Sequence, residues 1–471
     1  MLALACACLA AAPARAQDAA GLRGTMPVEE EDQPVTDLWR DAADAAAPTP
    51  RPRGRAGDPA AELPDEEDTT GRAIRTDRDN LRVGAIEGRE TFDDGDPFAP
   101  LGIRAGTFIL RPQLEQGIGW TSNSATAAGG RPSTFSETRL RLDADSDWSR
   151  HRASFSVDGS YRRSISGERI DEVDGRATGR IDFDLANELA AFVAGGYRVN
   201  PESASTPGAI AAAVERPLRH TFDASAGVSK DTGPLRFGLT GALMRQTFDD
   251  AELADGSVVS QRERDSTLAT ATLRAGYALS PALAPFVEAE IGRRFYDHER
   301  DSAGYARSAD HYALRAGVEL DLGEKLNGEI AAGWLTERPD DSRLSDISGL
   351  SLAGNLRWSP VRGTTVALSA STAVEGSTTP GDSGSLLHSG NLSVERELRA
   401  NLTGRAGAGL DWRDYSGGGH DIVMRGEAGL TWWMNRNAGI TARARHEVQE
   451  STRPGRDWDA TSVWLGMTLR R

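Results

Sequence analysis

The strongest constraint in this sequence is an alternation of apolar and charged residues with a period of two. It is clearest in residues 134–148, where Leu140 and Leu142 alternate with Arg139 and its charged neighbours. Side chains point to opposite faces of a β-strand, so this segment has one apolar and one charged face. A short polar step leads into a second alternating segment, residues 151–162, and the two predict an antiparallel hairpin.

The same alternation recurs to the end of the sequence. Besides the hairpin, it predicts sixteen further strands, at residues 107–120, 176–185, 189–199, 218–229, 235–248, 266–279, 285–296, 310–320, 326–336, 349–358, 364–374, 387–398, 402–413, 422–433, 439–448 and 459–471. Short connections alternate with long polar ones, of which residues 164–175 and 200–217 are examples. Short turns at one end and long loops at the other are typical of outer-membrane barrels.

The sequence therefore predicts an all-β fold, a transmembrane antiparallel up-and-down β-barrel of about eighteen strands. Sixteen would result if residues 387–398 and a neighbouring segment are not strands, and an even number is the rule for bacterial barrels. Mean hydropathy is only −0.46, but a barrel needs apolar residues only on its outer face. Tryptophans near strand ends agree with a membrane interface: Trp120, Trp148, Trp334, Trp358, Trp412 and Trp432, whereas Trp464 is mid-strand. A soluble sandwich or solenoid is the alternative.

The N-terminal part has a different composition. Residues 1–16 are mostly apolar and end in Ala14-Arg15-Ala16, the form of a signal-peptidase site, so we expect a signal peptide. Residues 17–96 contain acidic clusters and few large apolar residues, which predicts a mostly disordered periplasmic segment or a plug for the barrel. Residues 97–471 would form the barrel. Cys6 and Cys8 are the only cysteines, so the mature chain would have no disulfide.

A family resemblance enters at the start of the first strand. The segment Asp96-Pro-Phe-Ala-Pro-Leu-Gly-Ile-Arg-Ala-Gly-Thr-Phe, followed by Gly119-Trp-Thr-Ser-Asn123, resembles the opening of a proteobacterial family of outer-membrane β-barrel porins, the β-barrel porin 2-like proteins. In that family an acidic segment precedes a similar first strand that ends near an asparagine. The resemblance implies a pore, and some relatives accompany exopolysaccharide export.

The resemblance also implies partners, beginning with outer-membrane lipid and lipopolysaccharide. The barrel-assembly machinery usually recognises a last strand that ends in an aromatic residue, whereas this sequence ends Trp464-Leu-Gly-Met-Thr-Leu-Arg-Arg471. We expect recognition to depend on Trp464, Gly466 and Leu469 instead. A periplasmic export partner is a further expectation. Nucleic acid is not expected, because the net charge is −16.

The candidate functional residues lie on the charged face of each predicted strand. Fifteen are expected to line a pore: Arg139, Arg141, Asp143, Asp145, Arg180, Asp182, Asp223, Glu288, Glu290, Arg294, Arg315, Glu319, Arg405, Arg443 and Arg445. Acidic residues of 285–296 opposite basic residues of 402–413 and 439–448 would suit a channel for polar solutes or sugars, because charges across a pore set its ion preference. Mutual pairing that merely solvates the lumen is the alternative.

No enzymatic activity, metal or cofactor is expected. The peptide Gly381-Asp-Ser-Gly-Ser385 imitates a serine-protease motif, but no histidine in a matching context accompanies it. The seven histidines lack metal-ligand spacing. We therefore expect a bacterial outer-membrane pore with both termini in the periplasm. A gated portal for polysaccharide export, or a structural or adhesive barrel, is the alternative.

Overall fold

The structure is a computed structural model that describes residues 98–471, except 203–205, 209, 211–215 and 254. The expected signal peptide, residues 1–16, and the acidic segment, residues 17–96, lie outside the described residues. Within the described part of the chain, no helix has the length and apolar character needed to cross a membrane.

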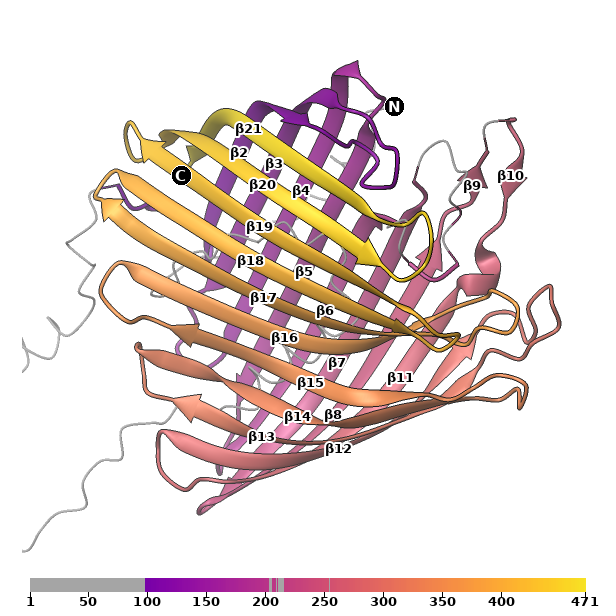
Figure 1. Ribbon diagram of the computed structural model, residues 1–471. Coiled ribbons are helices and arrows are strands. Elements are labelled where there is room, and N and C mark those ends of the chain that lie inside the picture. The colour runs from indigo at the N-terminus through magenta and orange to yellow at the C-terminus, as the bar shows by residue number, and fades with distance from the viewer. Residues whose placement is uncertain (1–97, 203–205, 209, 211–215, 254) are drawn as a thin grey trace, which may run out of the picture. The chain divides into compact units, whose positions relative to one another are not determined.

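Eighteen long strands form one closed antiparallel wall (Figure 1). They are β2 (Phe108–Thr121), β3 (Ser133–Ser146), β4 (Arg152–Gly167), β5 (Asp171–Asp184), β6 (Leu189–Pro201), β7 (Leu218–Thr232), β8 (Leu235–Phe248), β11 (Ser266–Tyr277), β12 (Leu283–Tyr296), β13 (Ala309–Asp321), β14 (Leu326–Pro339), β15 (Ile347–Trp358), β16 (Thr364–Gly376), β17 (Gly384–Arg399), β18 (Leu402–Tyr415), β19 (His420–Trp433), β20 (Ala438–Ser451) and β21 (Trp458–Arg470). Each strand pairs with its neighbours in sequence, and β21 pairs with β2. Closure leaves no open sheet edge in lipid.

Four small elements accompany the wall. The short strand β1 (Ile103–Ala105) pairs with the start of β2. The loop after β8 contains the hairpin of β9 (Ala251–Glu252) and β10 (Val258–Val259), followed by the 3-10 turn η1 (Arg262–Arg264). In Figure 1 the β9–β10 hairpin projects beyond the strand ends.

The prediction of a barrel of about eighteen strands is confirmed, and sixteen is excluded. Residues 387–398, the weakest assignment, belong to β17. The long loop expected at residues 164–175 is wrong, because β4 continues to Gly167 and β5 begins at Asp171. Only three residues connect these two strands, so the hairpin is longer than its apolar pattern indicates.

The outer face of the wall is apolar between two bands of aromatic side chains. Large exposed side chains such as Leu239, Leu273 and Ile291 lie on the outer parity. Exposed aromatic residues lie toward the strand ends, including all six expected tryptophans, Trp120, Trp148, Trp334, Trp358, Trp412 and Trp432. This arrangement is the lipid-facing surface of an outer-membrane barrel, in which aromatic side chains lie at the two membrane interfaces.

The junction between the first and last long strands is packed by one buried tryptophan. Trp464 is 6% exposed and faces the lumen, and the guanidinium of Arg443 lies 4.0 Å from the centroid of its ring. Gly117 and Gly466 are register partners across the junction. A Cβ atom on either would lie within about 2.5 Å of the Trp464 ring, so these positions need glycine for the ring to lie on the backbone.

Gly117→Val tests this packing. The added side chain has to displace the Trp464 ring at the junction, and overpacking of this kind costs about 1–3 kcal/mol. We expect a lower urea midpoint for the refolded protein in lipid vesicles, followed by heat-modifiable gel mobility. Gly426→Val is the matched control, because a Cβ there meets no atom within 4 Å. Equal stability of the two variants would contradict the proposed role of the ring.

Candidate functional site

The fifteen residues expected to line a pore all lie on the parity opposite the exposed apolar side chains. Several are almost completely buried although charged, including Arg139, Glu290, Arg294 and Arg315, which are 2–7% exposed. Charged side chains tolerate such burial only when they are paired and hydrogen-bonded. The partners therefore define what the inner face can do.

A network of ion pairs covers the inner face of β12, β13 and β14. Arg315 donates to Glu290 at 2.7 Å and lies 3.5 Å from Glu288. Arg294 donates to Glu337 at 2.5 Å. His311 lies between the two carboxylates, 3.2 Å from Glu290 and 3.3 Å from Glu337. The network joins three strands into one polar surface.

A second network crosses the junction where the barrel closes. Arg443 of β20 donates to Glu137 of β3 at 2.7 Å and lies 3.3 Å from Glu115 of β2. Glu115 and Glu137 are 2% and 3% exposed. One arginine therefore pairs with two buried carboxylates on strands from the other end of the chain.

Ion pairs elsewhere hold most of the remaining candidates. They are Arg141–Asp143 (3.6 Å), Asp145–Arg111 (2.7 Å), Arg180–Asp182 (2.7 Å), Glu319–Arg236 (2.8 Å), Arg405–Glu395 (3.4 Å) and Arg445–Glu447 (2.7 Å). Arg236 reaches Glu319 from β8 to β13, which are not neighbours in the wall. Arg139, Arg405, Arg443 and Arg445 also line one lumen cavity, together with Glu395 and Glu427.

The expected opposition of an acidic and a basic wall is not the dominant arrangement. Glu288 and Glu290 pair with Arg315 of the adjacent strand, and Arg443 pairs with carboxylates near the junction. Local pairing leaves a lumen surface of mixed charge with dipoles of many orientations.

The ends of β16 and β17 leave the wall and fold inward over the lumen. Pairing between β15 and β16 covers only Ala353–Ser371 to Trp358–Val366, whereas β16 and β17 stay paired to the tip. Val374 and Leu386 of this hairpin pack with Ala313, Leu335 and Ile347. The last three lie on the inner parity of β13, β14 and β15, so the hairpin lies inside these strands. We call residues 373–387 the inward hairpin.

Contacts on several sides hold the inward hairpin across the mouth. Arg294 of β12 donates to the carbonyl oxygen of Val374 at 3.4 Å, and Arg413 of β18 donates to Glu375 at 2.7 Å. Arg307 donates to the carbonyl oxygens of Asp382 and, at 3.0 Å, Thr379.

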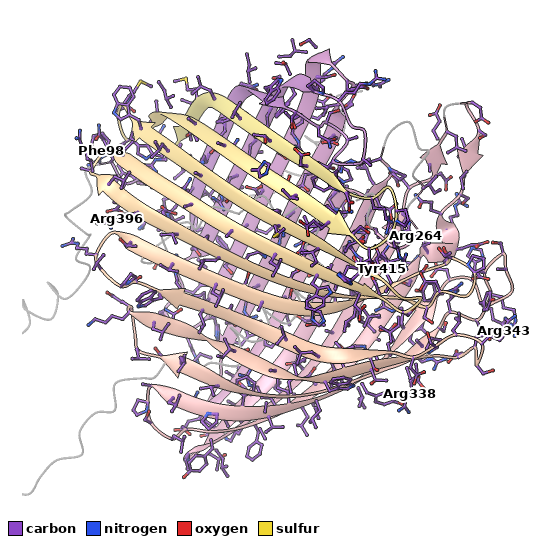
Figure 2. All side chains as sticks on the ribbon, viewed as in Figure 1. Phe98, Arg264, Arg338, Arg343, Arg396 and Tyr415 are labelled. Carbon is purple, nitrogen blue, oxygen red and sulfur yellow. The ribbon has the colours of Figure 1, made fainter. Side chains whose placement is uncertain are left out.

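Further contacts join the inward hairpin to neighbouring loops. The hydroxyl oxygens of Ser383 and Ser345 are 3.4 Å apart. Next to the hairpin, Arg264 binds Glu202 and the carbonyl oxygen of Pro207. Figure 2 shows Arg264 and Tyr415 at this long-loop end, with Phe98 and Arg396 at the short-turn end.

Loop carboxylates support the arginine contacts at the mouth. Arg307 donates to Asp301 at 2.7 Å. Asp341 accepts hydrogen bonds from the side chain of Arg343 and from the backbone N–H of Ala306. The hydrogen bonds from Arg343 hold the pKa of Asp341 well below its usual value. Asp341 is therefore ionised at neutral and mildly acidic pH. Its hydrogen bond from Ala306 then continues to hold the loop that carries Arg307.

The protease-like peptide, residues 381–385, is part of this inward hairpin. Asp382 accepts a hydrogen bond from Ser416 at 2.7 Å, and Ser385 donates to Glu375 at 3.2 Å. Asp382 and Ser385 therefore form hydrogen bonds that hold the inward hairpin in place at the mouth of the barrel. Within residues 98–471, apart from the gaps given above, no three His, Cys, Asp or Glu side chains are grouped so that they could hold a metal ion.

Several charged groups of the lumen were not among the sequence candidates. They include Glu115, Glu137, Arg274, His311, Glu329, Glu337, Glu375, Asp411, Arg413 and Arg425. All lie on the inner parity, so the alternation could have identified them. Their pairing could not be foreseen: Arg274 of β11 pairs with Glu329 of β14, three strands away in the wall.

The closed wall, the lipid-facing aromatic bands and the charged lumen define an outer-membrane β-barrel of porin type. Residues 96–471 match the family model described as "Putative beta-barrel porin 2", and the chain belongs to this family. The resemblance seen in the first strand is thereby confirmed. No curated protein matches the sequence.

Solved outer-membrane proteins show remote similarity. OpdK from Pseudomonas aeruginosa is 9% identical, with 77% of this chain and 99% of that chain covered and a TM-score of 0.35. A BenF-like porin from Pseudomonas fluorescens Pf-5 is 10% identical, with 77% and 98% covered and a TM-score of 0.37. The siderophore receptor PiuA from Acinetobacter baumannii is 9% identical, with 78% and 82% covered and a TM-score of 0.39. Similarity at this level identifies no solute.

Arg443→Met tests the network at the junction. The variant leaves Glu115 and Glu137 buried without their arginine, and breaking a buried pair in this way costs about 3–5 kcal/mol. We expect a large fall in the urea midpoint of the refolded barrel.

Arg293→Met serves as the control, because its partners Asp310 and Asp340 have side chains that are 45% and 38% exposed. Exposed pairs contribute about 0–1 kcal/mol. If Arg293→Met lowered the urea midpoint as much as Arg443→Met does, burial of the ion pair would not determine how much stability its loss costs.

Proposed function

We propose that this protein is an outer-membrane pore that passes polar solutes without catalysis. The observation that carries the proposal is the polar inner face of a closed barrel of eighteen strands, with charged residues of mixed sign on most strands. Barrels of 16–18 strands are wide enough for an aqueous channel. The fifteen residues named above would then line the path, and their local pairing favours polar solutes of either sign or none.

Orientation in the membrane follows from the unequal connections. Bacterial barrels place short turns in the periplasm and long loops outside. We therefore propose that the inward hairpin faces the exterior and that both ends of the barrel-forming segment face the periplasm. The outer leaflet, with its lipopolysaccharide, would surround the end at which Trp120, Trp334 and Trp412 lie.

Planar bilayer recording tests the pore. We expect the refolded full-length chain to give stepwise, ohmic currents carried by both cations and anions, because the lumen is locally neutralised. The same recording on a chain lacking residues 17–96 tests the expected plug. Currents that appear only after this deletion would assign gating to the segment. If neither chain gives a current, in bilayers or in the disulfide experiment described next, the proposal of a pore is contradicted.

A gated portal is the second candidate function, and the inward hairpin is the observation that favours it. A hairpin held over the mouth by Arg294, Arg307 and Arg413 offers a movable closure. Export of a polysaccharide with a periplasmic partner would be one use of such a gate. If no current is recorded, the remaining function is that of a structural or adhesive barrel that acts through its long loops.

A disulfide lock tests the gate. The hydroxyl oxygens of Ser345 and Ser383 are 3.4 Å apart, so Ser345→Cys with Ser383→Cys should form a cross-link that fixes the hairpin to the loop between β14 and β15. Cys6 and Cys8 are replaced by alanine in every chain tested. If the hairpin moves, oxidation should reduce the current at least several-fold and a reductant should restore it.

Ser156→Cys with Thr178→Cys is the matched control, because its oxygens are 2.7 Å apart on β4 and β5 and do not touch the hairpin. Its oxidation should leave the current unchanged. Currents from the Ser345–Ser383 pair that are equal in the oxidised and reduced states would exclude the hairpin as a gate.

A further inference from the structure

Charge is distributed unevenly around the short-turn end of the barrel. The turns that follow β15, β17 and β19, together with the end of β21, carry exposed arginines, and we call these residues the basic rim: Arg362, Arg396, Arg399, Arg436 and Arg471. The structure describes all of these turns, and the exposed carboxylate in them is that of Glu397, near the end of β17.

The other short turns do not repeat this pattern. At the ends of β3, β5, β7 and β13, acidic and basic residues occur together: Asp147, Arg150, Glu188, Lys230, Asp231, Glu324 and Lys325. A negatively charged chain would therefore be attracted to the part of the rim formed by β15–β21 and not to the rest.

The basic rim has the dimensions of a short peptide. The seven strands β15–β21 are neighbours in the wall. At about 4.8 Å per strand they extend over about 30 Å. An extended chain covers this distance with about nine residues.

The described chain begins next to the basic rim. Arg470, the last residue of β21, donates to the carbonyl oxygen of Phe98 at 2.6 Å, and its guanidinium lies 3.3 Å from the centroid of the Trp433 ring. Figure 2 shows Phe98 and Arg396 at the same end of the barrel. Whatever precedes Phe98 is thus tethered beside these arginines, and a tether raises the effective concentration of the chain it holds.

The sequence before Phe98 contains a stretch of the opposite charge. Residues 17–47 hold eight carboxylates and two arginines, and residues 29–37 hold five carboxylates and no basic residue. This run of nine residues matches the extent of the basic rim. Residues 48–97 separate the stretch from Phe98, and a chain of this length can span up to about 165 Å, so reach is not limiting.

We propose that the basic rim is a docking site for the acidic stretch, residues 17–47 of the same chain. The carboxylates of residues 29–37 would pair with the rim arginines. Exposed pairs are weak one by one, but several pairs on a tethered chain act together. Docking would hold the stretch outside the short-turn opening, whereas a plug would lie in the lumen. The proposal does not require the barrel to conduct.

Distances between two spin labels test the docking in the refolded full chain, with Cys6 and Cys8 replaced by alanine. Gln33→Cys carries one label. The second label is on Ala400→Cys, which is exposed in the turn between β17 and β18. We expect a population of short distances in phosphatidylcholine vesicles at low salt. It should be lost at about 1 M NaCl, where the Debye length is about 3 Å.

Thr232→Cys supplies the matched control position for the second label. Thr232 is exposed at the turn between β7 and β8, and six strands separate β8 from β17 along the shorter way around the wall. The pair of labels at positions 33 and 232 should show no short distances. Equal distance distributions for the two pairs at low salt would overturn the proposal, whether or not the barrel gives a current.

A charge swap tests the contact itself. Arg396→Glu with Arg399→Glu should abolish the short distances between positions 33 and 400. Adding Glu29→Lys, Glu30→Lys and Glu31→Lys should restore them, because the two charge patterns are then exchanged. Lys230→Glu with Lys325→Glu, in the other short turns, is the matched control and should leave the distances unchanged. Heat-modifiable gel mobility shows that each variant is folded.

Two further outcomes would overturn the proposal in favour of another arrangement. Short distances that persist after Arg396→Glu with Arg399→Glu would place the acidic stretch elsewhere, as in a plug of the lumen. Arginines at a membrane interface also attract anionic lipid. Short distances that are lost when phosphatidylglycerol replaces phosphatidylcholine would show that lipid headgroups occupy the basic rim instead.

Discussion

The structure depends on the need to pair every backbone N–H and C=O group of a strand that lies in lipid. An isolated strand cannot meet this need, and an open sheet leaves two edges unpaired, so the only sheet that suits lipid is a closed one. Once the wall closes between β2 and β21, the two faces of each strand are assigned. One face meets lipid and carries leucine, valine and aromatic residues, and the other meets the lumen and carries the charges.

Closure also explains why the charges of the lumen are paired locally. The inner side chains crowd one another, so that Arg294, Glu337 and Glu290 are almost fully buried although they face the lumen. Burial demands partners at short range. A neighbouring strand offers some of them, as in Arg315–Glu290, and strands further along the wall offer others, as in Arg274–Glu329.

Alternation predicted the strands and their faces wherever lipid imposes it, as in β3 and the first half of β4. It failed between residues 164 and 175, where β4 and β5 extend past the level of Tyr161 and the outer face no longer needs to be apolar. It was weakest at residues 387–398. The adjoining inward hairpin is buried on both faces, so its polar residues, such as Ser385, do not alternate with exposed apolar ones.

The candidate charges could be predicted from the alternation, whereas their partners could not: Arg443 pairs with Glu137 across 306 residues of sequence. The inward fold of the hairpin left no local signal, since Val374 and Leu386 keep the parity of ordinary wall residues.

The junction packed by Trp464 makes the barrel a structure that is completed by its last segment. Glu115 and Glu137 are made early in synthesis, and the arginine and the indole that cover them arrive only with β20 and β21. Until then the chain is a sheet with two exposed edges and two carboxylates without their cation. Long-range pairing of this kind is slow, because the ends of a long loop have to meet before any contact rewards them. A chain truncated before β20 therefore lacks every contact that closes the barrel, however stable its remaining hairpins are.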